Sequence, residues 1–429
     1  MTARFRRTVA ASALAAIAVL LTACADTTGS TSGEDGTITL TMTWWGNDTR
    51  LKNTRAIIDA FEQAHPDITI EPTYSDYSGY WDKLATQTAA DDTPDIMQMD
   101  EIYLSTYAQQ GVLLDLSALK DQFDLSGYPQ SAIDSGSVDG TLYALASGAA
   151  SYAFVANPGL FQKAGVEVPD DTTWTWDDFL ALTKQLSEKG GGDYYGFASS
   201  FGYDEGSLRL WLREQGETLF DADGKVAASE DAVASFFDYL TQLVKNGSTP
   251  PASTLQEGQG VGLSETFLAT NRVAVGSFWN SQLSALSDAS GSPLQLLMLP
   301  ESRGSDYLKP SSFWVGSGRT DHPEAVAQFI DFMVNSDEAA DIQLTERGIP
   351  LNEDVRAHIA PKLSEVDRAA VEYMDGLELG DAEPVTPPNG SQLVPILSRY
   401  AEQVVFGKLS PDEAAAGFLR ELKDAVANG

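Results

Sequence analysis

The chain has 429 residues, of which 62 are acidic and 27 are basic, so its formal net charge is −35 at pH 7. An acidic surface of this size repels phosphate backbones and anionic lipid headgroups, and it disfavours nucleic-acid binding. Hydrophobic residues make up 43% of the chain and charged residues 21%, which is typical of a globular protein long enough for two or three domains.

The N-terminal 23 residues are predicted to be an export signal. Three arginines and no acid precede an apolar run over 9–21, which is too short to span a bilayer. The run ends in the letters LTAC, and Cys24 is the single cysteine of the chain. This ending resembles the lipobox of bacterial lipoproteins, which implies that residues 1–23 are removed and that Cys24 carries a lipid anchor. An ordinary cleaved signal is the alternative, and the general and twin-arginine export routes both stay open.

Residues 24–36 are predicted to form a lipidated flexible tether, because the run ADTTGSTSGEDG after the cysteine is polar and rich in Gly, Ser and Thr. Strands and helices then alternate in the order strand 37–43, helix from 51 until Pro66, strand 68–70, helix 81–90 and strand 95–99. This βαβαβ order predicts an α/β fold with a mainly parallel sheet covered by helices.

The alternation continues through the rest of the chain. Strands are predicted at 142–145 and 152–155, and helices at 176–188, 229–245, 323–334 and 337–346. A last helix begins after Ser410, where Pro411 and Glu413 complete a helix-start pattern. The segment 221–224 faintly resembles a calcium loop, but its glycine comes two residues early, so a hairpin turn is predicted there.

Catalytic and metal-binding motifs are missing from the sequence. It contains no G-x-S-x-G, no H-E-x-x-H and no G-x-x-x-x-G-K-[ST] pattern. The three histidines, His65, His322 and His358, are scattered along the chain. We therefore predict no catalytic residue, no metal site and no cofactor.

Aromatic and polar residues gather instead where predicted strands end. Examples are Trp44, Trp45 and Asn47 after the first strand, and Asp100 with Glu101 after the third. Ligands of open α/β sheets bind outside the carboxyl ends of the strands. A pyranose ring stacks its C–H face on an indole, while its hydroxyl groups bind carboxylate or amide oxygens. The pattern therefore favours a carbohydrate ligand.

Several stretches in order along the chain carry a family resemblance: TLTMTWWGNDTR, YWDKLATQTAADDTPDIMQMD, GTLYALASGAASYAFVANPGLFQKAGV, NRVAVGSFWNS and HPEAVAQFIDFMVNSDEA. The chain resembles the extracellular solute-binding proteins of family 1, which are sugar-binding lipoproteins of ABC importers. The resemblance implies a two-lobed periplasmic-binding-protein fold, in which each lobe is a mainly parallel sheet flanked by helices.

The resemblance also implies how the chain is divided between the lobes. Lobe 1 is expected to comprise residues 37–148 and 312–384, and lobe 2 residues 149–311 and 385–429. Three hinge crossings are expected near 147–152, 308–312 and 383–388. The strand ends and the resemblance together predict these ligand-binding residues: Trp44, Trp45, Asn47, Asp76, Asp100, Glu101, Tyr152, Trp211, Trp279, Asn280, Trp314 and Arg347.

The implied function is capture of a sugar or oligosaccharide between the lobes and its delivery to the permease subunits of an ABC transporter. The protein is expected to be a monomer held at the extracellular face of the cell membrane through Cys24. A secreted glycoside hydrolase is one alternative, in which Asp100 and Glu101 would be the carboxylate pair. A peptide- or polyamine-binding protein is another.

Overall fold

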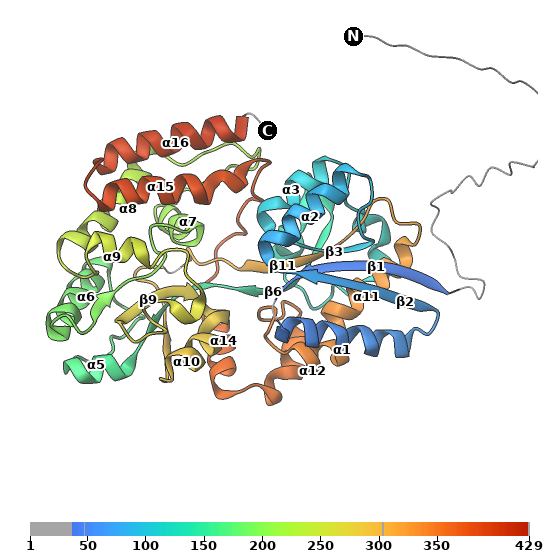
Figure 1. The fold of residues 1–429 in the computed structure, drawn as a ribbon, viewed down its shortest axis with the longest axis horizontal. Coiled ribbons are helices and arrows are strands. Elements are labelled where there is room, and N and C mark those ends of the chain that lie inside the picture. Colours follow the sequence, from blue (N-terminus) through green and yellow to red (C-terminus); the bar gives the residue numbers. More distant parts are fainter. Residues whose placement is uncertain (1–36, 47, 303, 428–429) are drawn as a thin grey trace, which may run out of the picture.

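The computed structural model describes residues 37–46, 48–302 and 304–427. The predicted signal, the tether, Cys24 and Asn47 lie outside the described residues. Two α/β lobes, each built around its own sheet, lie side by side (Figure 1). The predicted fold class, α/β with two lobes, is therefore confirmed.

The first sheet has the strand order β2-β1-β3-β11-β6. Its strands are β1 (Ile38–Trp45), β2 (Ile68–Ser75), β3 (Ile96–Met99), β6 (Ala144–Ala150) and β11 (Lys309–Gly316). β1 pairs in parallel with β2 and β3, whereas β11 runs antiparallel to both of its neighbours. The sheet is mixed because β11 returns from the second lobe and inserts between β3 and β6.

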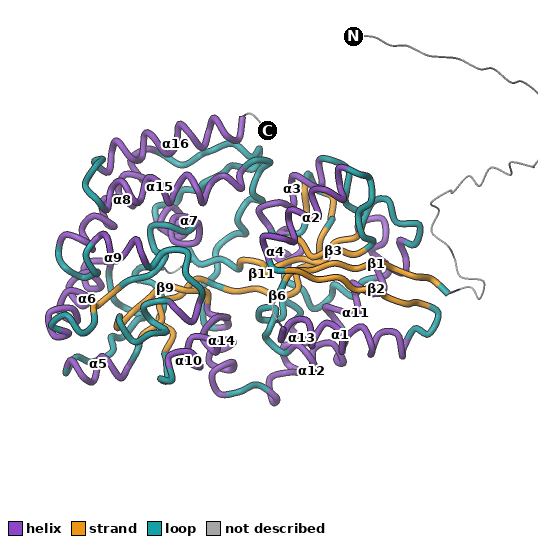
Figure 2. The backbone as a smooth tube through the Cα atoms, viewed as in Figure 1, coloured by secondary structure: helices purple, strands orange, loops and turns teal. Residues whose placement is uncertain are grey.

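Helices cover both faces of the first sheet (Figure 2). On β1, Met42 and Trp44 pack with α1 and α11, and Trp45 packs on the opposite face with α2 and α3. Side chains of a strand alternate between faces, so neighbouring tryptophans enter different cores. The helices of this lobe are α1 (Asp48–Ala64), α2 (Tyr77–Ala89), α3 (Glu101–Gln109), α4 (Gln130–Ser135), α11 (Pro323–Asn335), α12 (Asp337–Gln343) and α13 (Glu353–Ile359), and a short hairpin of β4 (Ser137–Val138) and β5 (Thr141–Leu142) adjoins them.

The second sheet has the order β10-β7-β9-β8, with strands β7 (Tyr152–Ala156), β8 (Tyr195–Phe197), β9 (Val273–Trp279) and β10 (Gln295–Leu297). β7 is antiparallel to both β9 and β10, and the parallel pair is β8 with β9. The prediction of a mainly parallel sheet is wrong for this lobe. Strand β7 enters directly from β6 of the other sheet and runs antiparallel to β9.

Most helices of the second lobe pack around one large hydrophobic core. They are α5 (Pro158–Ala164), α6 (Trp176–Gly190), α7 (Glu205–Glu214), α8 (Glu230–Lys245), α9 (Ala252–Glu257), α10 (Leu283–Ser290), α15 (Leu393–Val405) and α16 (Pro411–Ala427). The C-terminal helices α15 and α16 stack on α8, so the end of the chain completes this lobe (Figure 1).

Within its described residues, the chain passes between the lobes at three places. Ser151 separates β6 from β7, and residues 298–308 connect β10 to β11. The third passage lies between α13 and α14 (Glu365–Asp375), earlier than the predicted 383–388. Helix α14 packs against α10 and β10, where the hydroxyl of Tyr373 donates to the carbonyl of Tyr152 at 3.0 Å. This helix therefore belongs with the second sheet, although the predicted lobe 1 segment included it.

The structure differs from one local prediction and agrees with another. At 221–224, the N–H of Gly224 donates to the carbonyl of Asp221, and Phe220 pairs antiparallel with Val226, which confirms a hairpin turn. Helix α12 ends earlier than predicted, because Leu344 adopts a positive φ of 47°. Among residues 37–46, 48–302 and 304–427, no helix is long and apolar enough to cross a membrane.

Candidate functional site

Four side chains at the ends of strands lie in the region between the two sheets. β3 ends directly before Asp100, and β9 ends at Trp279. Tyr152 opens β7 opposite Trp279, and Lys309 opens β11. Polar and aromatic groups from both lobes therefore converge where the chain passes from one lobe to the other.

A pocket between the lobes, here called the hinge pocket, contains about 560 Å³ of space, part of it open to solvent. Asp100 contributes from the first lobe, Trp279 from the second lobe, and Lys309 from the strand that connects them. The complete lining is Asp100, Ala150, Trp279, Ser281, Gln282, Lys309, Pro310 and Ser311.

A second pocket, here called the serine pocket, contains about 830 Å³ and shares Trp279 and Gln282 with the hinge pocket. Its lining is Tyr152, Ala198, Ser199, Ser200, Asp204, Gly258, Gln259, Gly260, Val261, Leu263, Thr266, Phe267, Ser277, Phe278, Trp279 and Gln282. Trp279 and Gln282 line both pockets, so the hinge pocket and the serine pocket are neighbours, and the two together are here called the cleft.

A chain of hydroxyl groups ends on a carboxylate in the wall of the serine pocket. The hydroxyl of Tyr152 donates to Oδ2 of Asp204 at 2.6 Å and lies 2.9 Å from the hydroxyl of Ser277. Ser277 lies 2.6 Å from the hydroxyl of Ser199, and Ser200 donates to the same Asp204 oxygen at 2.5 Å. Hydroxyl groups both donate and accept, so this wall suits a ligand that is itself rich in hydroxyl groups.

Trp279 separates the two pockets and is partly exposed. The ring of Tyr152 packs edge-on against it, with centroids 5.1 Å apart. Nζ of Lys309 lies 5.1 Å from the centroid of the indole. Trp279 is thus fixed by neighbours while it still lines both pockets.

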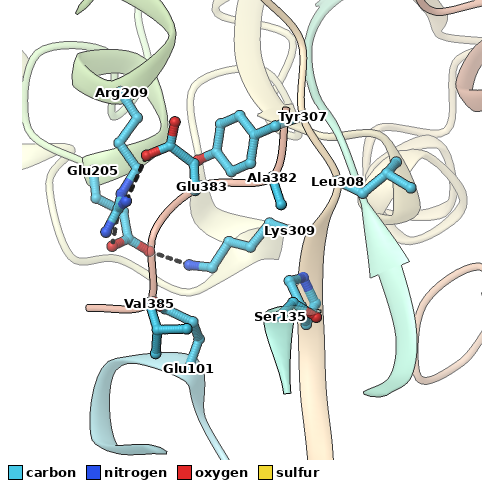
Figure 3. A pocket seen from close by; sticks show the side chains of 11 residues that line it. Glu101, Ser135, Glu205, Arg209, Tyr307, Leu308, Lys309, Ala382, Glu383 and Val385 are labelled. Atoms are coloured by element: carbon cyan, nitrogen blue, oxygen red, sulfur yellow. Dashed lines mark hydrogen bonds and ion pairs between the residues drawn. The ribbon is translucent and has the colours of Figure 1, made fainter. Parts of the chain in front are cut away.

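A cluster of charged side chains adjoins the hinge pocket and is drawn in Figure 3. Arg209 on α7 binds Glu383 at 2.8 Å, and Arg213 binds the other oxygen of that carboxylate at 2.6 Å. Lys309 forms an ion pair with Glu205. Burial raises the pKa of Glu205, but Lys309 and Arg209 outweigh it and hold the pKa below its usual range.

Asp100 and Glu101, adjacent in sequence, have separate surroundings. Asp100 caps α3 by accepting from the N–H of Ile102 at 3.3 Å, and it also accepts from the hydroxyl of Tyr77 at 3.1 Å. Glu101 lines the charge cluster and accepts two hydrogen bonds from Thr386. Burial raises the pKa of both carboxyl groups. Of the two, Asp100 lines the hinge pocket.

Some predicted site residues lie in hydrophobic cores instead. Trp44 and Trp314 are 0% exposed within the first lobe. Trp211 packs on Trp176 and Tyr239 in the second lobe and donates to the hydroxyl of Ser235 at 2.9 Å. None of these three tryptophans lines the cleft, because strand alternation or helix packing turns each ring inward.

Two further predicted residues hold the fold together. Asn280 is 0% exposed, accepts from the N–H of Ser151 at 2.9 Å and donates to the carbonyl of Ala370 at 2.9 Å. Arg347 is 2% exposed and donates to the hydroxyl of Thr54 at 2.7 Å. Burial, with the nearby charge of Arg50, lowers the pKa of Arg347 to about 9.

Trp45 and Asp76 lie at the edge of the first lobe. Trp45 is 8% exposed and is covered by Tyr77, Tyr80 and Trp81. Asp76 is exposed and caps α2 by accepting from the N–H of Gly79 at 3.0 Å. This cap starts α2 at Tyr77, before the predicted residue 81.

The sequence reading missed several residues that line the cleft, notably Asp204, Ser277 and Lys309. Asp204 precedes a helix and accepts from the N–H of Ser207 at 2.8 Å, so in sequence it looks like an ordinary helix cap. Tyr77 does not line the cleft, but its hydroxyl donates to Asp100, and it is also absent from the predicted set. Its signal was available, because an aromatic residue directly follows Asp76 at the end of the second strand.

A family model described as bacterial extracellular solute-binding protein matches residues 56–368. The lactose-binding protein of Rhizobium radiobacter is 22% identical over 223 residues, which are 51% of this chain and 52% of that protein.

Solved structures have the same fold. An extracellular solute-binding protein family 1 structure from Alicyclobacillus acidocaldarius is 25% identical, with a TM-score of 0.72 over 91% of this chain and 98% of that one. A periplasmic oligogalacturonide binding protein from Yersinia enterocolitica, in complex with saturated digalacturonic acid, is 25% identical, with a TM-score of 0.76 over 91% and 100%.

Proposed function

Because the chain belongs to the bacterial extracellular solute-binding protein family, we propose that it captures a sugar or oligosaccharide in the cleft between its lobes and releases it unchanged. The family is one of binding proteins and not of enzymes. Delivery to the permease subunits of an ABC transporter is part of the proposal, as is action as a monomer.

The composition of the cleft is the observation that carries this proposal. Trp279 offers an indole to the apolar face of a sugar ring. The hydrogen-bonded series of hydroxyl groups that ends on Asp204 offers donors and acceptors to the sugar hydroxyl groups. Both lie on the second lobe, while Asp100 faces the hinge pocket from the first. A sugar held between them would contact both lobes, so its binding would favour a closed form.

Asp100 and Glu101, the carboxylate pair of the glycosidase alternative, have separate surroundings. Glu101 accepts both hydrogen bonds from Thr386 in the charge cluster, while Asp100 lines the hinge pocket. A hydrolase needs two carboxyl groups on opposite sides of one glycosidic bond. Release of reducing sugar from oligosaccharides that bind the protein would contradict the proposal.

Thermal-shift screening of a neutral glycan panel tests the proposed function. A ligand at 100 times its Kd stabilises the folded protein by about 2.7 kcal/mol, which raises the melting temperature measurably. Titration calorimetry then gives the stoichiometry, expected to be one site per chain. If no saccharide in a panel of mono- to tetrasaccharides shifts the transition, the proposal is wrong.

A further inference from the structure

The residues that line the cleft include more carboxylates than cations. Among the described residues that line its two pockets, the carboxylates are Asp100 and Asp204, and the cation is Lys309. The carboxylates lie on different lobes, Asp100 in the hinge pocket and Asp204 in the serine pocket.

The cation of the cleft already has partners. Lys309 forms an ion pair with Glu205, whose side chain is 8% exposed, and its Nζ also lies over the ring of Trp279. Burial lowers the pKa of Lys309, but Glu205 and Asp100 outweigh it and raise the pKa above its usual range. The ammonium group is therefore neutralised by the protein's own carboxylates.

Hydrogen bonds from neighbouring groups hold the two carboxylates in place, and both can accept further hydrogen bonds. Asp204 receives hydrogen bonds from Tyr152, Ser200 and Ser207, and Asp100 receives them from Tyr77 and Ile102. A carboxylate oxygen has more than one acceptor site, so each group can also accept from a sugar hydroxyl. A carboxylate on the ligand would instead meet like charge, or lose its hydration without gaining a cation.

Given the saccharide-binding function proposed above, we infer that the cleft selects uncharged saccharides and rejects uronic acids. The net charge of −35 acts in the same direction on any anion that approaches. On this inference the chain differs in ligand charge from its structural relative that was solved with digalacturonic acid.

Matched pairs of saccharides test the inference on the wild-type protein. Each pair has the same linkage and differs in the C6 group: α-1,4-galactobiose with digalacturonic acid, and β-1,4-mannobiose with dimannuronic acid. The dimethyl ester of digalacturonic acid serves as an uncharged control of similar size. Titration at pH 7 is expected to show that the acid of a pair binds at least about tenfold more weakly than its neutral partner.

The outcomes separate this inference from the proposed function. Acids that bind as tightly as their neutral partners, or more tightly, would overturn the inference and leave saccharide binding intact. If neither these pairs nor the wider neutral panel bind, the proposed function fails and the inference fails with it. Binding of the ester but not of the acid supports the inference directly.

A variant supplies the reverse test. Glu205→Gln removes the partner of Lys309 and frees its charge for a ligand carboxylate, so the preference for the neutral sugar is expected to shrink by about tenfold. Asp82→Asn removes one negative charge from the exposed surface of α2 and is expected to leave the preference unchanged. A preference that is equal in Glu205→Gln, Asp82→Asn and wild type, with all three folded by circular dichroism, would contradict the inference.

Discussion

Glu101 and Thr386 are 285 residues apart in sequence, yet two hydrogen bonds join them. The backbone N–H of Thr386 donates to Oε1 of Glu101 at 2.7 Å, and its hydroxyl donates to Oε2 at 3.0 Å. The same hydroxyl accepts from Nη2 of Arg209 on α7 at 2.9 Å. Thr386 thus connects the first helix turn of α3 in one lobe to α7 in the other.

Thr386→Val is expected to lower the free energy of unfolding by about 1–3 kcal/mol, because it leaves a buried guanidinium N–H and a carboxylate oxygen without a partner. Urea unfolding measures the change. Thr270→Val, at an exposed threonine of the second lobe, is the control and should stay within about 0.5 kcal/mol of wild type. Equal midpoints for Thr386→Val and wild type would show that the connection adds no stability.

Truncation of two tryptophans should distinguish a side chain that binds ligand from one that belongs to the core. Trp279→Ala is expected to weaken saccharide binding by about thirtyfold, or ~2 kcal/mol, with little loss of melting temperature, because the ring lines the cleft. Trp314→Ala is expected to cost about 3–5 kcal/mol of stability, because the ring is 0% exposed, and to preserve affinity in the folded fraction. Calorimetry of both variants measures the contrast, and a reversed result would mean that the site assignment is wrong.

Stability should fall as the pH rises through neutrality. Burial raises the pKa of Glu214 to about 8 and that of Asp306 to about 7, from ordinary values of 4.5 and 3.8. The folded state therefore holds these protons more tightly than the unfolded state. The resulting stabilisation is complete below the unfolded values and is lost as pH rises toward the folded ones.

Glu214→Gln is expected to flatten this decline of melting temperature between pH 5 and 8. Glutamine can still accept the hydrogen bond that Nε1 of Trp176 donates to Oε2 of Glu214 at 2.7 Å. Glu372→Gln, at an exposed position on α14, is the matched control and should keep the wild-type slope. A variant slope equal to that of wild type would exclude Glu214 as a source of the pH dependence.

Lipid anchoring through Cys24 stays a prediction, because this residue lies outside the described part of the chain. Cys24→Ala is expected to release the protein from the membrane fraction of the expressing cell, since the thioether attachment cannot form. Immunoblots of membrane and medium fractions measure the distribution. Retention of the variant in membranes at the wild-type level would be evidence against the anchor.

Sequence periodicity predicted several elements, among them β1, α1, α6, α8 and α11, but it did not predict the site. Trp44 and Trp45 follow the predicted strand 37–43, but they are the last two residues of β1, and the helices on the two faces of the sheet enclose one ring each. Trp279 was predictable because β9 ends there, at the edge of the sheet. The hydrogen bond between Tyr152 and Asp204 was not predictable, because 52 residues separate them. In sequence, Tyr152 looks like the start of a strand and Asp204 like a helix cap.

The position of β11 inside the first sheet determines when that sheet can assemble. β3 and β6 have no pairing with each other, so the first sheet stays divided until residues 309–316 are available. The second sheet needs only strands between residues 152 and 297. During synthesis from the N-terminus, the strands of the second sheet are all available before β11, so the later-encoded sheet can assemble before the one that contains β1.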